Sequence, residues 1–315
     1  MTGRGYARVL HRNLASNALP VTIAIIILVF TIAQPAFLSP ENLLGIVRQM
    51  TLVGIMAIAM TFVIMTGGVD LSVGPVLALS GLVSFFALDA GMPLPVAVAA
   101  GLAVGIAVGL ANGVLIAFLG LPPIIVTLAL LSIVRGVALI FGGPELHLIR
   151  NQPAFTFIGT GTVIGLPLSV WIFAVAAGVL MFVQGRTALG LQVPAIGENE
   201  RAAYLSGLRV RPIKMSLYAL SGFGAALAGI IQSSQVHTAA ATYGEFGTEL
   251  DVIASVVLGG TSLIGGTGSI GRTLLGVLFL GVINNGMNIL NVPLDAQLMA
   301  KGVIIVLSLA LSEMK

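Results

Sequence analysis

The sequence predicts an all-α, polytopic membrane protein of about ten transmembrane helices. Mean hydropathy is +1.11, 57% of the residues are hydrophobic and only 8% are charged. Soluble domains carry about 25% charged residues, so this chain of 315 residues has too few charges to cover a water-facing surface. Apolar runs of about 20 residues, the length that a helix needs to cross the hydrocarbon core, recur along the chain.

Ten apolar runs are predicted to be spans. They lie near 19–38, 46–66, 74–90, 93–119, 122–142, 167–184, 214–236, 249–265, 270–291 and 295–312. The basic tail 1–18 before the first run is typical of a signal peptide, but no small-residue cleavage site follows the run. We therefore expect the tail to stay in the cytoplasm and residues 1–315 to form a single transmembrane domain.

The charges predict the orientation of these spans. Lys and Arg gather in the loops of one side, which is the cytoplasmic side of bacterial membrane proteins. Both termini and the segment 185–213 then lie in the cytoplasm, and the stretch 142–165 is the longest external loop, where we expect an outside partner. The cytoplasmic basic residues are Arg4, Arg8, Arg12, Arg186, Arg201, Arg209, Arg211, Lys214, Arg272 and Lys315. The external acidic residues are Glu41, Asp89, Glu145, Glu245, Glu249, Asp251 and Asp295.

The segment 185–213 carries the longest polar stretch between spans and predicts a short surface helix near 198–206. Gly197 is expected at its start. Glu198 and Glu200 are expected in its first turn, because carboxylates favour the positive end of the helix dipole. Gly207 suits the left-handed residue that closes a helix. Such a helix either lies on lipid headgroups or is the contact through which another protein moves the spans.

Polar residues inside the spans are candidates for a translocation pathway. Asp70 follows a glycine-rich break, where a carboxylate either caps a helix start or takes part in transport. Three asparagines of the ninth span share one face, where amides either join helices or line a path for an uncharged hydroxylated solute. Arg135 and Lys301 are expected to pair or to extend toward the interface. The pathway candidates are Asp70, Asn112, Thr127, Asn284, Asn285 and Asn288.

The sequence shows no catalytic or metal-binding pattern. There is no cysteine, and the three histidines fall in separate loops without the spacing of metal ligands. No nucleophile elbow and no pair of carboxylates on one span is present. We therefore predict that the chain is not an enzyme and holds no cofactor or metal. If ATP drives transport, a partner polypeptide hydrolyses it.

Three stretches resemble the permease subunits of bacterial monosaccharide ABC importers, of the ribose, xylose and galactoside type. These subunits belong to the branched-chain amino acid and sugar permease superfamily. The stretches are TGGVDLSVGPVLALSG (66–81), AIGENERAAYLSGLRVRPIKMSLYALSG (195–222) and ELDVIASVVLGGTSLIGGTGS (249–269). The similarity runs in the expected order from about residue 40 to 312.

The resemblance implies a multi-pass subunit of the bacterial inner membrane that transports a pentose or hexose. The implied partners are a second permease subunit, identical or paralogous, a cytoplasmic ABC ATPase subunit and a periplasmic substrate-binding protein. In this family the cytoplasmic segment forms a coupling helix that docks on the ATPase. Carried over by motif, the contact residues are Gly197, Glu198, Asn199, Glu200, Arg201, Ala202, Ala203, Leu205, Ser206 and Gly207.

Other functions stay open at this point. The same class of importer carries nucleosides, branched-chain amino acids or furanose signal molecules. An ion-coupled secondary transporter would need an essential acidic residue inside the membrane, for which Asp70 is the only candidate. A structural membrane subunit would transport nothing, and its interior amides would only join helices.

Overall fold

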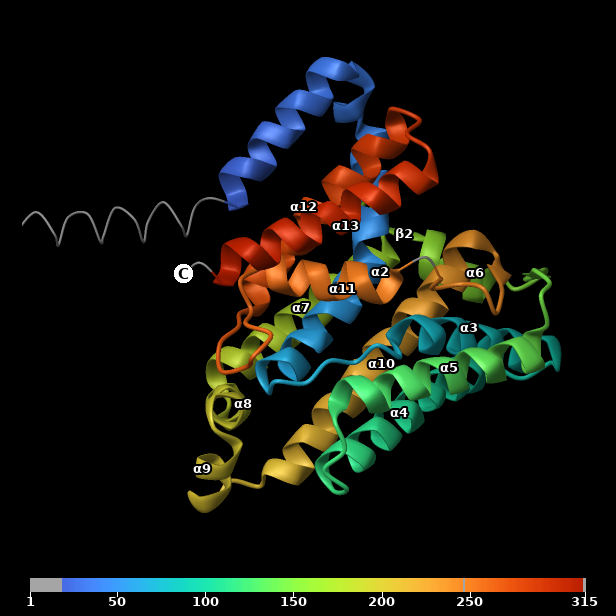
Figure 1. Cartoon of the computed structure of the whole chain (residues 1–315). Helices are drawn as coiled ribbons and strands as arrows, with labels where there is room; N and C mark the ends of the chain where they lie inside the picture. Colours follow the sequence, from blue (N-terminus) through green and yellow to red (C-terminus); the bar gives the residue numbers. More distant parts are fainter. Residues whose placement is uncertain (1–18, 246, 314–315) are drawn as a thin grey trace, which may run out of the picture.

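The chain folds mainly into helices (Figure 1). This computed structural model describes residues 19–245 and 247–313. The predicted cytoplasmic tail 1–18 lies outside the described residues, and so do the basic residues Arg4, Arg8, Arg12 and Lys315. The prediction of a polytopic all-α membrane protein is confirmed.

Six helices in the described part of the chain are long and apolar enough to cross a membrane. They are α2 (Pro40–Met65), α4 (Leu94–Ala117), α5 (Pro123–Gly142), α7 (Leu168–Arg186), α10 (Val210–Val236) and α12 (Ile270–Ile289). The helix Leu19–Ala33 and α3 (Val73–Asp89) are apolar but shorter. The last helix is α13 (Leu294–Glu313).

Short elements connect these helices. They are η1 (Pro35–Leu38), α6 (Pro153–Thr160), α8 (Ala188–Glu198), α9 (Glu200–Leu205), α11 (Thr248–Leu258) and the strands β1 (His147–Leu148), β2 (Thr162–Val163), β3 (Leu166–Pro167) and β4 (Thr238–Ala239). Strands β1 and β4 pair antiparallel, and β2 pairs with β3. The predicted external stretch 142–165 therefore carries structure of its own, and Ser234 Oγ of α10 anchors α6 by donating to Phe155 O at 2.6 Å.

The predicted span 249–265 is wrong as a crossing helix. Helix α11 has 11 residues, about 16 Å at 1.5 Å per residue, whereas the hydrocarbon core is about 30 Å thick. A loop, 259–269, follows it, because Gly260, Gly265 and Gly266 adopt φ of +84°, +99° and +82°, which ends a helix. Each of the ten predicted runs contains a helix, but only six of those described reach the length and hydropathy of a span.

Helix α10 is the centre of the bundle and packs against α2, α3, α4 and α6. Its contact with α4 depends on glycine: a Cβ added to Gly222 would lie 2.0 Å from Gly105 O. A Cβ added to Gly109 would lie 2.3 Å from Tyr218 O. Small residues thus bring the two backbones together, as is typical of helix contacts in membranes.

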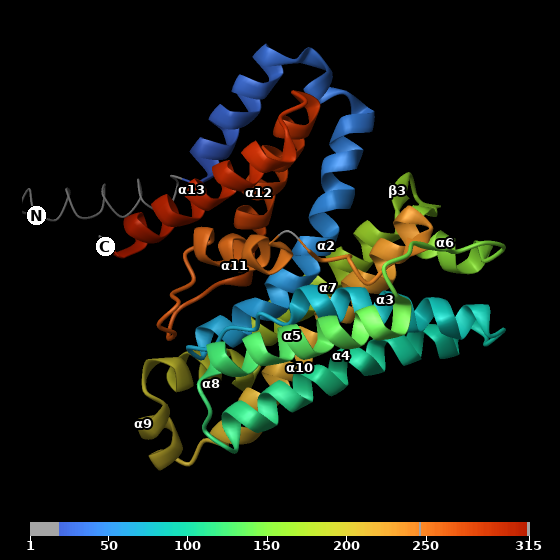
Figure 2. The same cartoon turned by 45° about the vertical axis from the view of Figure 1, so that its right-hand side comes forward.

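The outer faces of α5 and α7 are apolar and uncovered in the single chain. Ile125, Ile140 and Phe182 are 65%, 89% and 62% exposed. In a membrane, hydrocarbon covers such side chains at no cost in free energy. Exposure of the same side chains to water would be unfavourable. Helices α8 and α9 lie at one end of the bundle and α6 at the opposite end (Figure 2).

Candidate functional site

The predicted coupling segment consists of two short helices, because Asn199 interrupts it. Asn199 is extended, with φ −156°, and its side-chain Oδ1 accepts a hydrogen bond from Ala202 N at 2.9 Å, so that it caps α9. The predictions that Gly197 starts the helix and that Glu198 lies in its first turn are wrong, since both belong to α8. Gly207, with φ +86°, follows α9 as predicted.

Helix α9 presents most of the predicted contact residues to its surroundings. Glu200 stays largely exposed while its Oε2 pairs with Lys214 Nζ of α10 at 2.9 Å, which fixes α9 against α10. Leu205 is 76% exposed at the tip of this polar segment. The residues exposed in the single chain are Glu198, Asn199, Glu200, Arg201, Ala202, Leu205, Ser206 and Gly207. Ala203 is buried and Gly197 is half-buried, so these two support the segment from inside.

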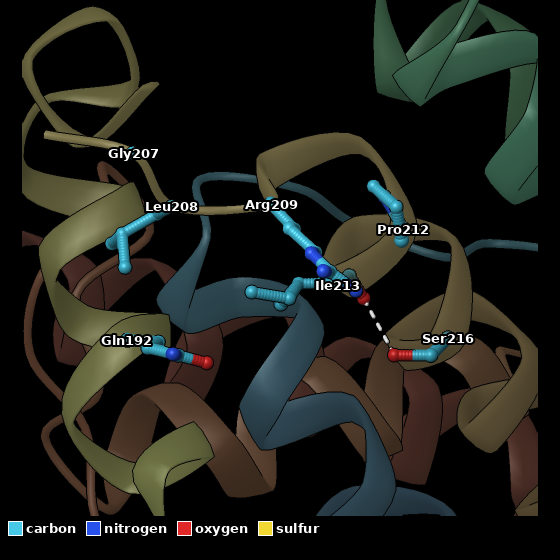
Figure 3. Close-up of a pocket in the computed structure, with 7 residues that line it drawn as sticks. All are labelled: Gln192, Gly207, Leu208, Arg209, Pro212, Ile213 and Ser216. Atoms are coloured by element: carbon cyan, nitrogen blue, oxygen red, sulfur yellow. Dashed lines mark hydrogen bonds between the residues drawn. The ribbon is translucent and has the colours of Figure 1, made fainter. Parts of the chain in front are cut away.

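Two grooves flank α9. Figure 3 shows the first, of about 420 Å³, between α8 and the start of α10. Its lining residues are Gln192, Gly207, Leu208, Arg209, Pro212, Ile213 and Ser216. The second groove, of about 460 Å³, is lined by Glu200, Arg201, Tyr204, Val210 and Arg211. An exposed leucine and two grooves that contain Arg201, Arg209 and Arg211 offer contacts to another protein.

The coupling segment touches two other glycine-rich stretches at a point that we call the glycine junction, made of Met65, Gly67, Gly197, Gly265 and Gly266. A Cβ on Gly197 would lie 1.8 Å from Met65 O at the end of α2, and 2.5 Å from Gly266 N. Gly266 N donates to Met65 O at 3.0 Å. A Cβ on Gly265 would lie 2.9 Å from both Gly67 N and Gly197 O. All three stretches that carry the family resemblance meet here.

Gln184 of α7 holds the same region from a second side. Its Nε2 donates to Gly268 O at 3.2 Å, and its Oε1 accepts from Ile270 N, the first residue of α12, at 3.0 Å. The helix that leads into α8 is therefore bonded to the loop 259–269 and to α12. The coupling segment is thus in direct contact with α2, α7 and the loop that leads into α12.

Three pathway candidates lie together at the break between α2 and α3. Asp70 is fully buried, and its Oδ1 accepts from Ser72 N at 3.0 Å, from Ser72 Oγ at 2.6 Å and from Asn112 Nδ2 at 3.3 Å. Thr127 Oγ1 donates to Val69 O at 3.2 Å. This network joins the segment before α3 to α4 and α5. Asp70 bonds to Ser72, the residue that precedes α3, and no side chain caps the helix itself.

The three asparagines of α12 meet different surroundings, although they share one face of the helix. Asn285 Nδ2 donates to Asn42 Oδ1 of α2 at 2.9 Å. Asn288 Oδ1 accepts from Gln297 Nε2 of α13 at 2.9 Å. These two amides join helices. Asn284 lines a cavity, and its Oδ1 has no hydrogen-bond partner within the described residues.

That cavity, of about 200 Å³, lies among α2, α10, α11, α12 and α13. The polar residues of its lining are Gln49, Gln232, Thr248, Asp251, Asn284 and Lys301. Asp251 Oδ2 and Lys301 Nζ form an ion pair at 2.8 Å, and both side chains are largely buried, with 14% and 19% exposed. Lys301 is therefore paired, as one of the two predicted alternatives stated.

Comparison with known proteins decides the family. The model of the branched-chain amino acid transport system permease component matches residues 42–309. The chain belongs to this family. This permease is similar to the ribose import permease protein of Bacillus subtilis (strain 168), with 43% identity over 293 residues, 92% of this chain and 90% of that protein.

Two further relatives agree with this assignment. The ribose import permease protein of Escherichia coli (strain K12) is 40% identical over 298 residues, 94% of this chain and 92% of that protein. The L-arabinose ABC transporter permease protein of Azospirillum brasilense is 35% identical over 278 residues, 88% of this chain and 81% of that protein. No solved structure matches the permease.

The sequence missed one functional candidate of this permease, Asp251. It was predicted to lie outside the membrane, with Asp70 as the only interior acid, but it faces the cavity among the helices. The cavity position was not foreseen because α11 was treated as a full span that begins at the external surface. The signal that could have found it is Lys301, a cation within an apolar run that needs an acidic partner. Arg135 is satisfied differently, by the carbonyl oxygens of Ala241 and of Tyr243, the latter at 2.8 Å.

Proposed function

We propose that this permease is the transmembrane subunit of an ABC importer that takes up a monosaccharide, a pentose or a hexose. Relatives named for ribose, L-arabinose and galactofuranose transport support this cargo, at 34–43% identity. A separate ATPase subunit supplies the energy, a periplasmic binding protein delivers the sugar, and a second permease subunit completes the pathway. Residues 1–315 form one domain in the bacterial inner membrane.

The observation that carries this proposal is the attachment of α8 and α9 to the glycine junction. Closure of an ATPase dimer pushes α9, and the Glu200–Lys214 pair passes this movement to α10. Gly197 passes it to the end of α2 and to the loop 259–269 through backbone contacts that leave no room to slide. Close-packed backbones transmit displacement because they cannot be compressed. Helices on both sides of the interior then move as rigid bodies.

The proposed orientation places both termini and the segment 185–213 in the cytoplasm. Arg186, Arg201 and Arg209 at the end that carries α8 and α9 support it through the positive-inside rule. The described end of α13 lies toward the same side of both views as α8 (Figures 1 and 2). Ten crossings result if the segment 237–245, which contains β4 and a turn, makes one crossing together with α11. The contact of Gly244 with Gly74, where a Cβ on Gly74 would lie 2.6 Å from Gly244 O, supports this by placing the segment against the start of α3.

The proposed pathway carries an uncharged solute. The interior charges of Asp251 and Lys301 cancel, and no ring of like charges, the feature of an ion pathway, occurs among the described residues. Asn284 is the pathway candidate with the strongest support because it faces a cavity. Asp70, Asn112 and Thr127 support the pathway from the break between α2 and α3. Asn285 and Asn288 hold its walls together.

Reconstitution tests the proposal. The permease is co-purified with its ATPase and placed in liposomes with the sugar-loaded binding protein outside and ATP inside. We expect sugar uptake that needs all three proteins and ATP. Sugar flux through the permease alone, driven by an ion gradient without nucleotide, would reject it. Uptake of leucine in place of sugars would move the cargo to the amino acid class named in the family description.

A further inference from the structure

The cavity among α2, α10, α11, α12 and α13 has the chemistry of a binding site. We propose that it binds a neutral polyhydroxylated solute, so that each permease subunit holds one internal sugar site with Asp251, Asn284 and Lys301 as its polar contacts. This inference rests on the proposed function and assigns the residues that meet the sugar.

The lining of the cavity offers unused donors and acceptors. The side chains of Gln49, Gln232 and Asn284 make no hydrogen bond to another described residue; Gln49 is exposed and Gln232 half-buried, whereas Asn284 Oδ1 is buried without a partner. A buried polar group normally finds a partner, because a group left unpaired costs about 1–3 kcal/mol. The unpaired oxygen of Asn284, with two further unbonded amides in the same lining, therefore indicates a ligand that both donates and accepts. Hydroxyl groups do both at each position.

The ion pair adds the strongest contacts without adding net charge. Lys301 Nζ uses one of its three N–H donors for Asp251 Oδ2, and Asp251 Oδ1 accepts no hydrogen bond from a described residue. A sugar hydroxyl can bridge the two, donating to the carboxylate and accepting from the ammonium group. A cationic or anionic solute would leave one partner of the pair opposed by a like charge. The pair thus selects for a neutral solute.

Size and lining agree with a monosaccharide. The cavity of about 200 Å³ holds several times the ~30 Å³ that a water molecule occupies in the liquid. Besides its polar residues, the lining contains Leu52, Met56, Leu77, Val277 and Leu280. A lining with both polar and apolar side chains matches a sugar ring, whose hydroxyl edges need hydrogen bonds while its C–H faces need none.

The position of the cavity connects it to the coupling segment. Asp251 lies in the first turn of α11, and the loop 259–269 at the other end of α11 enters the glycine junction. Helix α2 lines the cavity through Met56 and ends at Met65 in the same junction. A movement of α8 therefore shifts two walls of the cavity together. This geometry suits a site that releases its sugar when the coupling segment moves.

Protection of a thiol tests the site. The permease has no cysteine, so Asn284→Cys places a single thiol on the cavity wall. In the assembled importer in lipid nanodiscs, without binding protein, the rate of modification by a small methanethiosulfonate is followed by mass spectrometry of the permease. We expect slowing by the imported sugar among ribose, arabinose and galactose. At about ten times the half-protecting concentration, modification should be about tenfold slower.

Matched variants separate binding from indirect effects. Ala90→Cys, exposed at the end of α3, should react at a rate that no sugar changes. Adding Asp251→Asn to Asn284→Cys should raise the half-protecting concentration about tenfold, the loss expected for one charge-assisted hydrogen bond. Gln232→Cys provides a second reporter if Asn284→Cys fails to assemble.

The outcomes distinguish this inference from the proposed function. An importer that takes up sugar, with no protection at either reporter, overturns the cavity site and leaves the transport function intact. Equal protection by leucine and by the sugar overturns the neutral-polyol class. An importer that takes up leucine and no sugar rejects both, because the site would then have the wrong ligand.

Discussion

Gly197 lies directly against the carbonyl oxygen of Met65, so close that a Cβ on Gly197 would sit 1.8 Å from it. This contact joins the coupling segment to the end of α2. Gly266 N donates to the same carbonyl oxygen at 3.0 Å, which adds the loop after α11. One backbone oxygen thus connects three segments that are distant in sequence.

Gly197→Ala should uncouple the ATPase from transport. The methyl group cannot fit without separating α8 from α2, and overpacking of this kind costs about 1–3 kcal/mol. We expect the stimulation of ATPase activity by the loaded binding protein to fall to about a tenth or less. A tenfold loss corresponds to about 1.4 kcal/mol, which lies within the cost of overpacking. Gly178→Ala on α7 is the control, because nothing lies within 4 Å of its Cβ position. Full stimulation in Gly197→Ala would show that the junction does not transmit movement.

Glu200→Lys should also reduce stimulation, with little effect on stability. The Glu200 side chain is 55% exposed, and exposed ion pairs contribute only about 0–1 kcal/mol. Its loss instead frees α9 from α10 and brings a like charge to Lys214. We expect the double variant Glu200→Lys, Lys214→Glu to recover part of the stimulated ATPase activity.

Arg201→Glu separates internal coupling from contact with the ATPase. Arg201 is exposed beside the groove of Tyr204 and Arg211 and makes no ion pair with a described residue. Reversal of its charge should weaken co-purification with the ATPase subunit, whereas Glu200→Lys with Lys214→Glu should not. Normal co-purification and normal stimulation in Arg201→Glu would place this side chain outside the interface.

The sequence was sufficient for most helices but not for the interior. Apolar runs located the helices because each must face lipid or a core, and Gly207 marked the end of α9 because few other residues adopt positive φ. The end of α11 was missed, since hydropathy cannot distinguish an apolar helix from an apolar loop with glycines such as Gly260. The pairing of Asp251 with Lys301 was consequently not foreseen.

The contacts between distant segments were beyond sequence reasoning. The spacing of Asn284, Asn285 and Asn288 predicted one shared face, and the face is present. Their partners depend on the crossing of α12 with α2 and α13, which spacing does not contain. The glycine junction likewise depends on the tertiary arrangement, although the three stretches that form it were each recognisable as motifs.

Asn284→Leu should reduce sugar uptake, whereas Asn285→Leu should reduce thermal stability. Asn284 has no partner to lose, so its replacement should leave assembly intact and reduce sugar uptake. Asn285→Leu leaves Asn42 without its partner, and interhelical hydrogen bonds in membranes contribute about 0.6–2 kcal/mol. We expect a lower midpoint of thermal unfolding for this variant. Reduced uptake by Asn285→Leu at unchanged thermal stability would show that Asn285 contacts the transported solute and does not mainly join helices.

Removal of either partner of the Asp251–Lys301 pair should destabilise the permease more than removal of both. Lys301→Met leaves a largely buried carboxylate, and breaking a buried pair costs up to about 3–5 kcal/mol, whereas apolar or neutral replacement of both partners is often neutral. Because both side chains keep some exposure, the cost should lie at the lower end of that range. Thermal unfolding of Lys301→Met, Asp251→Asn and the double variant measures it. If the double variant is as unstable as the worse single variant, the pair does not act as a unit, and Asp251 interacts chiefly with another group.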